Sequence, residues 1–182
     1  MVQLPPLLLT GGPAAGKTVT AQALARTTPR CAYIDVDDVR QLVKNGGAAP
    51  WEGKEGRNQH LLGVRNAAAL SANFTRNMFN VTISDVIDAE LLTSYRDLIP
   101  GVRIIRLSIG LEAARDRARS RPVYLTDEEF ESLHRQQCTP LDVDLDIDVT
   151  GMAFQEQVET IRQSWSGSLS RSETSVSETA WS

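Results

Sequence analysis

Aromatic residues, cysteines and lysines are all scarce in this 182-residue chain. The net charge of −4 gives no general electrostatic reason to bind nucleic acid or an anionic membrane. Cys31 and Cys138 lie far apart without metal-ligand spacing, which favours reduced thiols and suits a cytoplasmic protein. The apolar stretch 4–9 is short and interrupted by Pro5 and Pro6, so it predicts neither a signal peptide nor a membrane span.

One of the three lysines lies in Gly11–Thr18, Gly-Gly-Pro-Ala-Ala-Gly-Lys-Thr, which fits the phosphate-loop pattern G-x-x-x-x-G-K-[ST]. Leu7-Leu8-Leu9 before it predicts a strand and Thr20–Arg26 after it predicts a helix, the context that the pattern requires. Its glycines let backbone N–H groups approach phosphate oxygens, and the helix N-terminus adds its positive dipole. The alternative is a Gly-rich turn that matches by chance.

The pattern assigns a role to each position of this loop. Lys17 would reach the β- and γ-phosphates of a nucleotide, and the Thr18 hydroxyl would hold Mg²⁺. The residues that we expect to bind the nucleotide are Gly11, Gly12, Pro13, Ala14, Ala15, Gly16, Lys17, Thr18 and Val19.

Strand-like and helix-like segments alternate along the chain. The expected strands are 7–10, 32–36, 81–84, 102–107 and 145–149. The first expected helix follows the phosphate loop and ends near residue 27, and the others span 39–44, 58–78, 89–98, 111–119, 126–137 and 153–164. This alternation predicts an α/β protein of the P-loop class, with a five-stranded parallel sheet covered by helices on both faces. Alternating aspartates make the fifth strand a weak or edge strand. Residues 1–165 are expected to form one domain, and 166–182 a disordered Ser/Thr-rich tail.

Acidic residues follow the second expected strand. Asp35 and Asp37 are two positions apart on an extended segment, so both can face the phosphates. One carboxylate could then hold Mg²⁺ through water while the other takes a proton from an attacking hydroxyl. The alternative is a solvated helix start, because Asp37 or Asp38 would be an ordinary N-cap or first-turn residue.

The phosphate loop followed by Asp35 and Asp37 resembles the small-molecule P-loop kinases, the group that contains shikimate kinase, gluconate kinase and chloramphenicol phosphotransferase. The resemblance covers about residues 4–165. It implies ATP and Mg²⁺ as cofactors and transfer of the γ-phosphoryl group to a hydroxyl of a small molecule. It also implies that Asp37 contacts and deprotonates that hydroxyl while Asp35 supports the magnesium with Thr18. The loop departs from the family in its Ala14-Ala15 interior, where Gly-Ser is more usual, and Asp38 adds a third acid.

Arginines recur at every second position from 115 to 121. On a helix, Arg117 and Arg121 share one face, and the other two share nearly the opposite face. The resemblance makes 115–126 a lid, because Arg121-Pro122 resembles the start of the shikimate kinase lid. It implies that Arg121 and then Arg117 approach the transferred group, and that Arg115 lies against adenine. The alternative is a solvated face that pairs with Glu112 and Asp116.

Substrate residues are harder to assign from sequence. Besides Asp37, the candidates are Trp51 in a polar loop and Arg40, one helical turn beyond Asp37. Asp85 ends the third strand, where either a Walker-B acid or a substrate contact belongs. Asp88 is a weaker candidate. His60 and His134 occur on expected helices without nearby partners, so we expect both at the surface.

Other functions remain open at this point. A nucleoside, nucleotide or polynucleotide 5′-kinase would use the same motifs, although the acidic balance disfavours a polynucleotide. A nucleotide-binding switch or a non-catalytic P-loop module is a further alternative, but a Ras-type switch would carry Asn-Lys-x-Asp and no lysine here follows Asn. Neither a nucleic acid nor a membrane partner is expected. The acceptor, a metabolite or an antibiotic, and the oligomeric state are left open.

Overall fold

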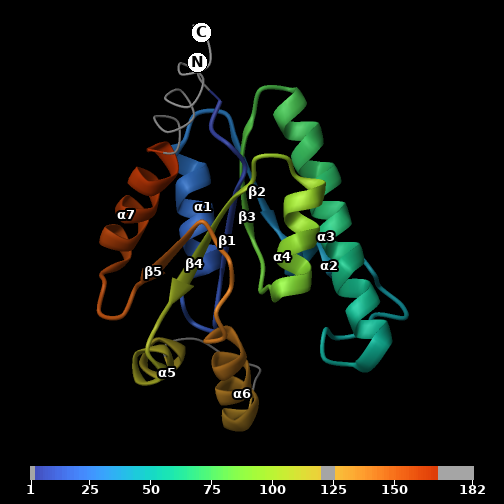
Figure 1. Cartoon of the computed structure of the whole chain (residues 1–182), viewed down its shortest axis with the longest axis vertical. Coiled ribbons are helices and arrows are strands. Elements are labelled where there is room, and N and C mark those ends of the chain that lie inside the picture. Colours follow the sequence, from blue (N-terminus) through green and yellow to red (C-terminus); the bar gives the residue numbers. More distant parts are fainter. Residues whose placement is uncertain (1–2, 120–125, 168–182) are drawn as a thin grey trace, which may run out of the picture.

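Across residues 3–119 and 126–167, which the computed structural model describes, five parallel strands form one sheet in the order β2-β3-β1-β4-β5 (Figure 1). The strands are β1 (Leu7–Gly11), β2 (Cys31–Asp35), β3 (Asn80–Ser84), β4 (Arg103–Ser108) and β5 (Leu145–Asp148). The central strand β1 pairs with β3 and β4, so that Leu7 lies beside Thr82 and Arg103. The expected five-stranded parallel sheet is confirmed, and β5 is an edge strand as expected.

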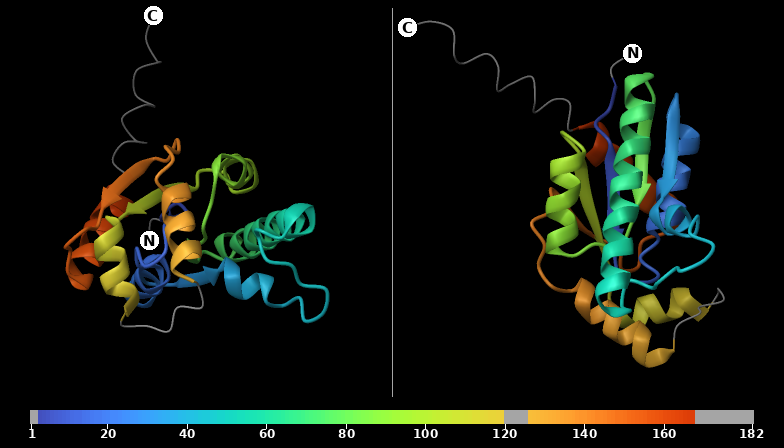
Figure 2. Two further views of the ribbon diagram at one scale, coloured as in Figure 1. Left: turned by 90° about the horizontal axis from the view of Figure 1, so that it is seen from below. Right: turned by 90° about the vertical axis from the view of Figure 1, so that its right-hand side faces the viewer.

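The helices cover both faces of the sheet and its carboxyl edge. They are α1 (Lys17–Thr27), α2 (Val36–Arg40), α3 (Gly53–Arg76), α4 (Ala89–Leu98), α5 (Leu111–Arg119), α6 (Asp127–Gln137) and α7 (Phe154–Ser166). Helices α1 and α7 lie on one face and α3 and α4 on the other, as both views show (Figure 1, Figure 2). Helices α5 and α6 lie beyond the carboxyl ends of the strands, at the edge where the phosphate loop also lies.

Two hydrophobic clusters explain why β1 begins with three leucines. Leu7 and Leu9 point into a cluster with residues of α1 and α7, including the fully buried Trp165. Leu8 points the other way, into a cluster with Val64 of α3 and Tyr95 of α4. Because successive side chains of a strand alternate between faces, a strand covered on both sides needs an unbroken apolar run.

The largest differences from the expected boundaries flank the acidic segment. Helix α2 spans Val36–Arg40 rather than 39–44, because the Asp35 side chain caps it by accepting a 2.9 Å hydrogen bond from the Asp37 N–H. Helix α3 begins at Gly53, inside a stretch expected to be a loop up to Gly56.

Helix α7 ends later than expected and includes Ser166, while residues 168–182 of the expected tail lie outside the described part. Among the described residues, no helix has the length and apolar content needed to cross a membrane.

Candidate active site

The phosphate loop joins the end of β1 to the start of α1 and depends on left-handed backbone conformations. Gly11, Ala14 and Gly16 have φ angles of 140°, 58° and 90°. A Cβ on Gly11 would lie 2.2 Å from the Leu107 carbonyl oxygen of β4, so only glycine fits there. Within the described chain, nothing accepts a hydrogen bond from the backbone N–H groups of residues 16–18. These donors at the positive end of α1 are suited to bind an anion.

Lys17 extends from the first turn of α1 across this loop. Its Nζ donates a 3.0 Å hydrogen bond to the Gly12 carbonyl oxygen. Burial lowers the pKa of Lys17, and the carboxylates of Asp37, Asp85 and Asp35 oppose that effect. An anionic ligand in the loop would therefore stabilise the protonated form of this lysine further.

Thr18 and Asp35, the two residues expected to hold magnesium, lie next to each other. The Thr18 hydroxyl lies 3.5 Å from Asp35 Oδ2, which also accepts hydrogen bonds from the Tyr33 hydroxyl at 2.7 Å and the Ser84 hydroxyl at 3.3 Å. No cluster of three or more His, Cys, Asp or Glu residues that could bind a metal occurs in the described segments. The oxygen donors present nevertheless fit Mg²⁺, which needs only one or two protein ligands when phosphate oxygens and waters complete its shell.

Asp37 is the acid of this segment that stays open. Its side chain is 64% exposed, and its one ion-pair partner among the described residues is Arg40, with 3.3 Å between Oδ1 and Nη1. The pKa of Asp37 is raised, first because the surrounding protein limits its hydration and then because Asp85 and Asp35 are near; Arg40 and Lys17 oppose the rise. Because the carboxylate is still exposed to solvent, water screens part of this effect.

The neighbouring acid, Asp38, lies exposed in the first turn of α2. No described residue contacts its carboxylate through a hydrogen bond or an ion pair. This position matches the alternative of an acid that only favours the helix N-terminus.

A buried polar cluster lies behind these acids, and it corrects the expected surface position of His60. His60 is only 6% exposed on the inner face of α3, and its Nε2 lies 3.2 Å from Asp85 Oδ1. The Tyr95 hydroxyl of α4 donates a 2.7 Å hydrogen bond to Asp85 Oδ2. Asp85 itself is 4% exposed, so it faces the interior and does not offer an open carboxylate to a substrate.

His134 is also more enclosed than expected. Its Nε2 lies 2.8 Å from the Ile109 carbonyl oxygen, and a Cβ built on Gly12 would lie 3.8 Å from its ring. Helix α6 therefore covers one side of the phosphate loop. Cys138 at the end of α6 is an exposed free thiol, and Cys31 is a half-buried one.

The weaker acid candidate, Asp88, has a structural role. It caps α4 by accepting a 3.0 Å hydrogen bond from the Leu91 N–H, and it forms an ion pair with Arg57 of α3 at 2.8 Å. Arg57 also pairs with Glu90. These contacts join α3 to α4 beside the buried cluster.

The two remaining substrate candidates lie in α2 and before α3. The aliphatic stem of Arg40 packs on Gly63 of α3, where a Cβ would come within 2.8 Å of Arg40 Cγ. Its guanidinium stays next to Asp37. Trp51 is 65% exposed in the turn that precedes α3. Its role as a pocket wall stays a prediction.

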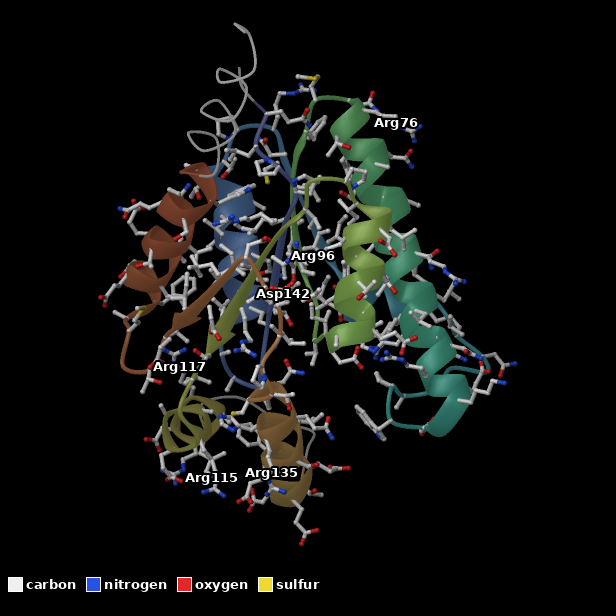
Figure 3. All side chains as sticks on the ribbon, viewed as in Figure 1. Arg76, Arg96, Arg115, Arg117, Arg135 and Asp142 are labelled. Carbon is white, nitrogen blue, oxygen red and sulfur yellow. The ribbon has the colours of Figure 1, made fainter. Side chains whose placement is uncertain are left out.

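Arg115 points toward α6 and not toward the phosphate loop. It pairs with Glu112 at 2.9 Å and with Glu131 of α6, and Figure 3 shows it on the side of α5 near α6. Arg119 pairs with Asp116 at 2.8 Å. This face of α5 thus matches the ion-paired alternative rather than the expected contact with adenine.

Arg117 is directed elsewhere than expected. It donates hydrogen bonds to the carbonyl oxygens of Val149 at 2.8 Å and Met152 at 3.0 Å, and to Gln157 Oε1 at 3.3 Å (Figure 3). Its guanidinium therefore holds the β5–α7 connection in place, which corrects the expectation that it points at the transferred phosphoryl group. Arg121 and the rest of 120–125, which is half of the expected lid, lie outside the described residues.

Comparison with known proteins shows the fold. No protein-family model and no curated protein matches the chain. A gluconokinase structure from Sinorhizobium meliloti has a TM-score of 0.66 at 13% identity, covering 98% of this chain and 99% of that one. Shikimate kinase from Aquifex aeolicus has a TM-score of 0.58 at 18% identity, over 90% and 98%. The tunicamycin resistance protein of Deinococcus radiodurans has a TM-score of 0.59 at 20% identity, over 89% and 95%. The chain shares the fold of these structures, a parallel sheet with helices on both faces.

Proposed function

We propose that the chain is an ATP-dependent kinase that transfers the γ-phosphoryl group of ATP to a hydroxyl of a small molecule. The observation that carries this proposal is the meeting of four side chains at one edge of the sheet. Lys17 and Thr18 begin α1, Asp35 ends β2, and the open Asp37 follows it in α2. A phosphate-binding loop, a magnesium position and an unblocked base are the three parts that phosphoryl transfer needs.

The nucleotide phosphates would bind at the loop. The open N–H groups of Gly16, Lys17 and Thr18 would donate hydrogen bonds to phosphate oxygens, and the Lys17 ammonium would add its charge. Thr18 and Asp35 would hold Mg²⁺, which supplies neutralisation of the phosphate oxygens when it is bound. The hydrogen bonds from Tyr33 and Ser84 orient the Asp35 carboxylate for that role.

Asp37 is the residue that we assign as general base. Asp35 is engaged by the Tyr33 and Ser84 hydroxyls, and Asp85 is closed off in the interior. Asp37 alone among these three is exposed, and its raised pKa brings it nearer to the range in which a carboxylate accepts a proton effectively. It would orient the acceptor hydroxyl and take its proton, while Arg40 beside it would bind a polar group of the substrate.

Closure over the transferring group belongs to the segment after α5. We propose Arg121 for this role, on the resemblance of Arg121-Pro122 to the shikimate kinase lid. Arg117 is already bonded to the β5–α7 connection, so we do not assign it to this closure.

The acceptor is proposed to be a hydroxylated metabolite or antibiotic, since the proteins of similar structure include gluconokinase, shikimate kinase and a tunicamycin resistance protein. The test measures ADP release from Mg-ATP against a panel of such compounds, with an oligonucleotide as a further arm. An acceptor that raises ADP release in the wild type but not in Asp37→Asn supports the proposal. Slow hydrolysis that no small molecule changes would overturn it, and stimulation by the oligonucleotide alone would replace it with a polynucleotide kinase.

A further inference from the structure

Gln157 reaches the phosphate loop from the far end of the chain. It lies in the first turn of α7, is only 2% exposed, and uses both N–H groups of its side-chain amide. One donates to the Ala15 carbonyl oxygen at 3.0 Å and the other to the Thr20 hydroxyl at 2.9 Å. A Cβ on Gly16 would lie 2.9 Å from Gln157 Nε2, so the amide also occupies the space beside that glycine.

Arg117 sets the orientation of this amide. It donates to Gln157 Oε1 at 3.3 Å, and a guanidinium can only donate hydrogen bonds. The Ala15 carbonyl can only accept them. The oxygen of the Gln157 amide must therefore face Arg117, and its nitrogen must face the loop.

The contact with Ala15 also determines where the next N–H points. The peptide bond between Ala15 and Gly16 is trans and planar, so its C=O and N–H point in opposite directions. Because the C=O is bonded to α7, the N–H of Gly16 points away from α7 and is one of the open donors of the loop. A glycine can adopt positive or negative φ at little cost, so this peptide could otherwise rotate and turn its oxygen toward a phosphate.

We propose that Gln157 is a positioning residue that locks the Ala15–Gly16 peptide with its N–H directed at a phosphate of the bound nucleotide. The proposal rests on the proposed nucleotide-dependent function and deepens it. It assigns to α7 a part in phosphate recognition that no motif in the sequence marks. Arg117 acts indirectly, because it orients the Gln157 amide, which in turn binds the Ala15–Gly16 peptide.

The test compares binding of ADP and of adenosine, measured by calorimetry and competition. Gln157→Leu keeps about the same side-chain volume and removes the hydrogen bond to the Ala15 carbonyl oxygen. Gln157→Glu keeps the oxygen that faces Arg117 but places a second oxygen against the Ala15 carbonyl. The matched control is Gln163→Leu, on the exposed side of the same helix.

We expect each Gln157 variant to bind ADP about 5- to 50-fold more weakly, since one well-aimed hydrogen bond to a charged phosphate is lost. Adenosine, which has no phosphate, should bind within about twofold of the wild type. Gln163→Leu should bind both ligands as the wild type does. Thermal unfolding verifies that each variant folds, and Gln157→Glu alone carries the test should Gln157→Leu not fold.

Several outcomes would overturn the proposal. Unchanged ADP affinity in a folded Gln157 variant would show that the peptide needs no lock. An equal loss of ADP and adenosine affinity would assign Gln157 a structural role only. If the wild type binds neither ADP nor ATP, the proposed nucleotide-dependent function itself is wrong, which is a different result from a failure of the lock.

Discussion

Replacing Asp37 by Asn tests the proposed base and has opposite expected effects on turnover and on stability. The amide keeps the shape of the side chain but accepts no proton, so kcat should fall by about 10² to 10⁴ with little change in ATP affinity. The pKa of Asp37 is raised in the folded protein, so the native state binds its proton more tightly than the unfolded chain does. Ionisation of Asp37 therefore lowers the free energy of unfolding as the pH rises above the ordinary aspartate pKa. Below that pH the side chain is protonated in both states, and the free energy of unfolding is not lowered.

At neutral pH, Asp37→Asn should therefore raise the melting temperature of the nucleotide-free protein. The 64% exposure of the side chain screens the effect, so the gain should stay below about 1 kcal/mol, or roughly 2–4 °C for a chain of this size. It should shrink as the pH is lowered toward the ordinary aspartate pKa. The assay combines steady-state kinetics at neutral pH with thermal unfolding at several pH values.

The neighbouring acids are the matched controls. Asp38→Asn should change neither turnover nor melting temperature appreciably, because no described residue contacts that exposed carboxylate. Asp35→Asn should raise the Mg²⁺ concentration needed for half-maximal rate. A crippled Asp38→Asn beside a mild Asp37→Asn would refute the reasoning, because the acid that faces the substrate would then be one residue further on.

Two more substitutions separate phosphate binding from folding. Lys17→Ala should abolish phosphoryl transfer while the melting temperature changes by no more than a few degrees, because burial already disfavours the charged amine; full turnover in a folded variant would disprove the central assignment. Tyr95→Phe removes the 2.7 Å hydrogen bond to the buried Asp85 carboxylate, which should cost on the order of 1–3 kcal/mol, or roughly 2–12 °C in melting temperature. A shift below 1 °C in thermal unfolding would contradict this contact.

The fold could be predicted from the sequence because its signals are local. The apolar run of β1, the β-branched residues of β4 and the capping box at Thr126 each mark an element by short-range chemistry. Errors occurred where a side chain overrode propensity. Asp35 starts α2 three residues before the expected position, because its carboxylate accepts the Asp37 N–H.

The candidate site was predictable only where the residues are close in sequence. Gly11–Thr18 could be recognised because one turn supplies both the N–H groups and the lysine. His60 and Gln157 were missed because they contact the site from α3 and α7. The sequence did carry a signal for both residues. His60 falls on the buried face of α3 and Gln157 on the buried face of α7. A polar side chain on a buried face needs a polar partner.

The charges around Lys17 explain why the nucleotide should enter together with a divalent cation. The carboxylates of Asp37, Asp85 and Asp35 all favour the protonated form of this lysine, so the site already carries negative charge before any phosphate binds. A bare polyphosphate would meet their repulsion across a partly dehydrated site, where charges interact more strongly than in water. A cation held between Thr18 and Asp35 would neutralise the Asp35 carboxylate and part of the phosphate charge. If the proposed function is right, the same acids that would orient the metal and accept the proton would make productive binding depend on the Mg²⁺ complex of the nucleotide.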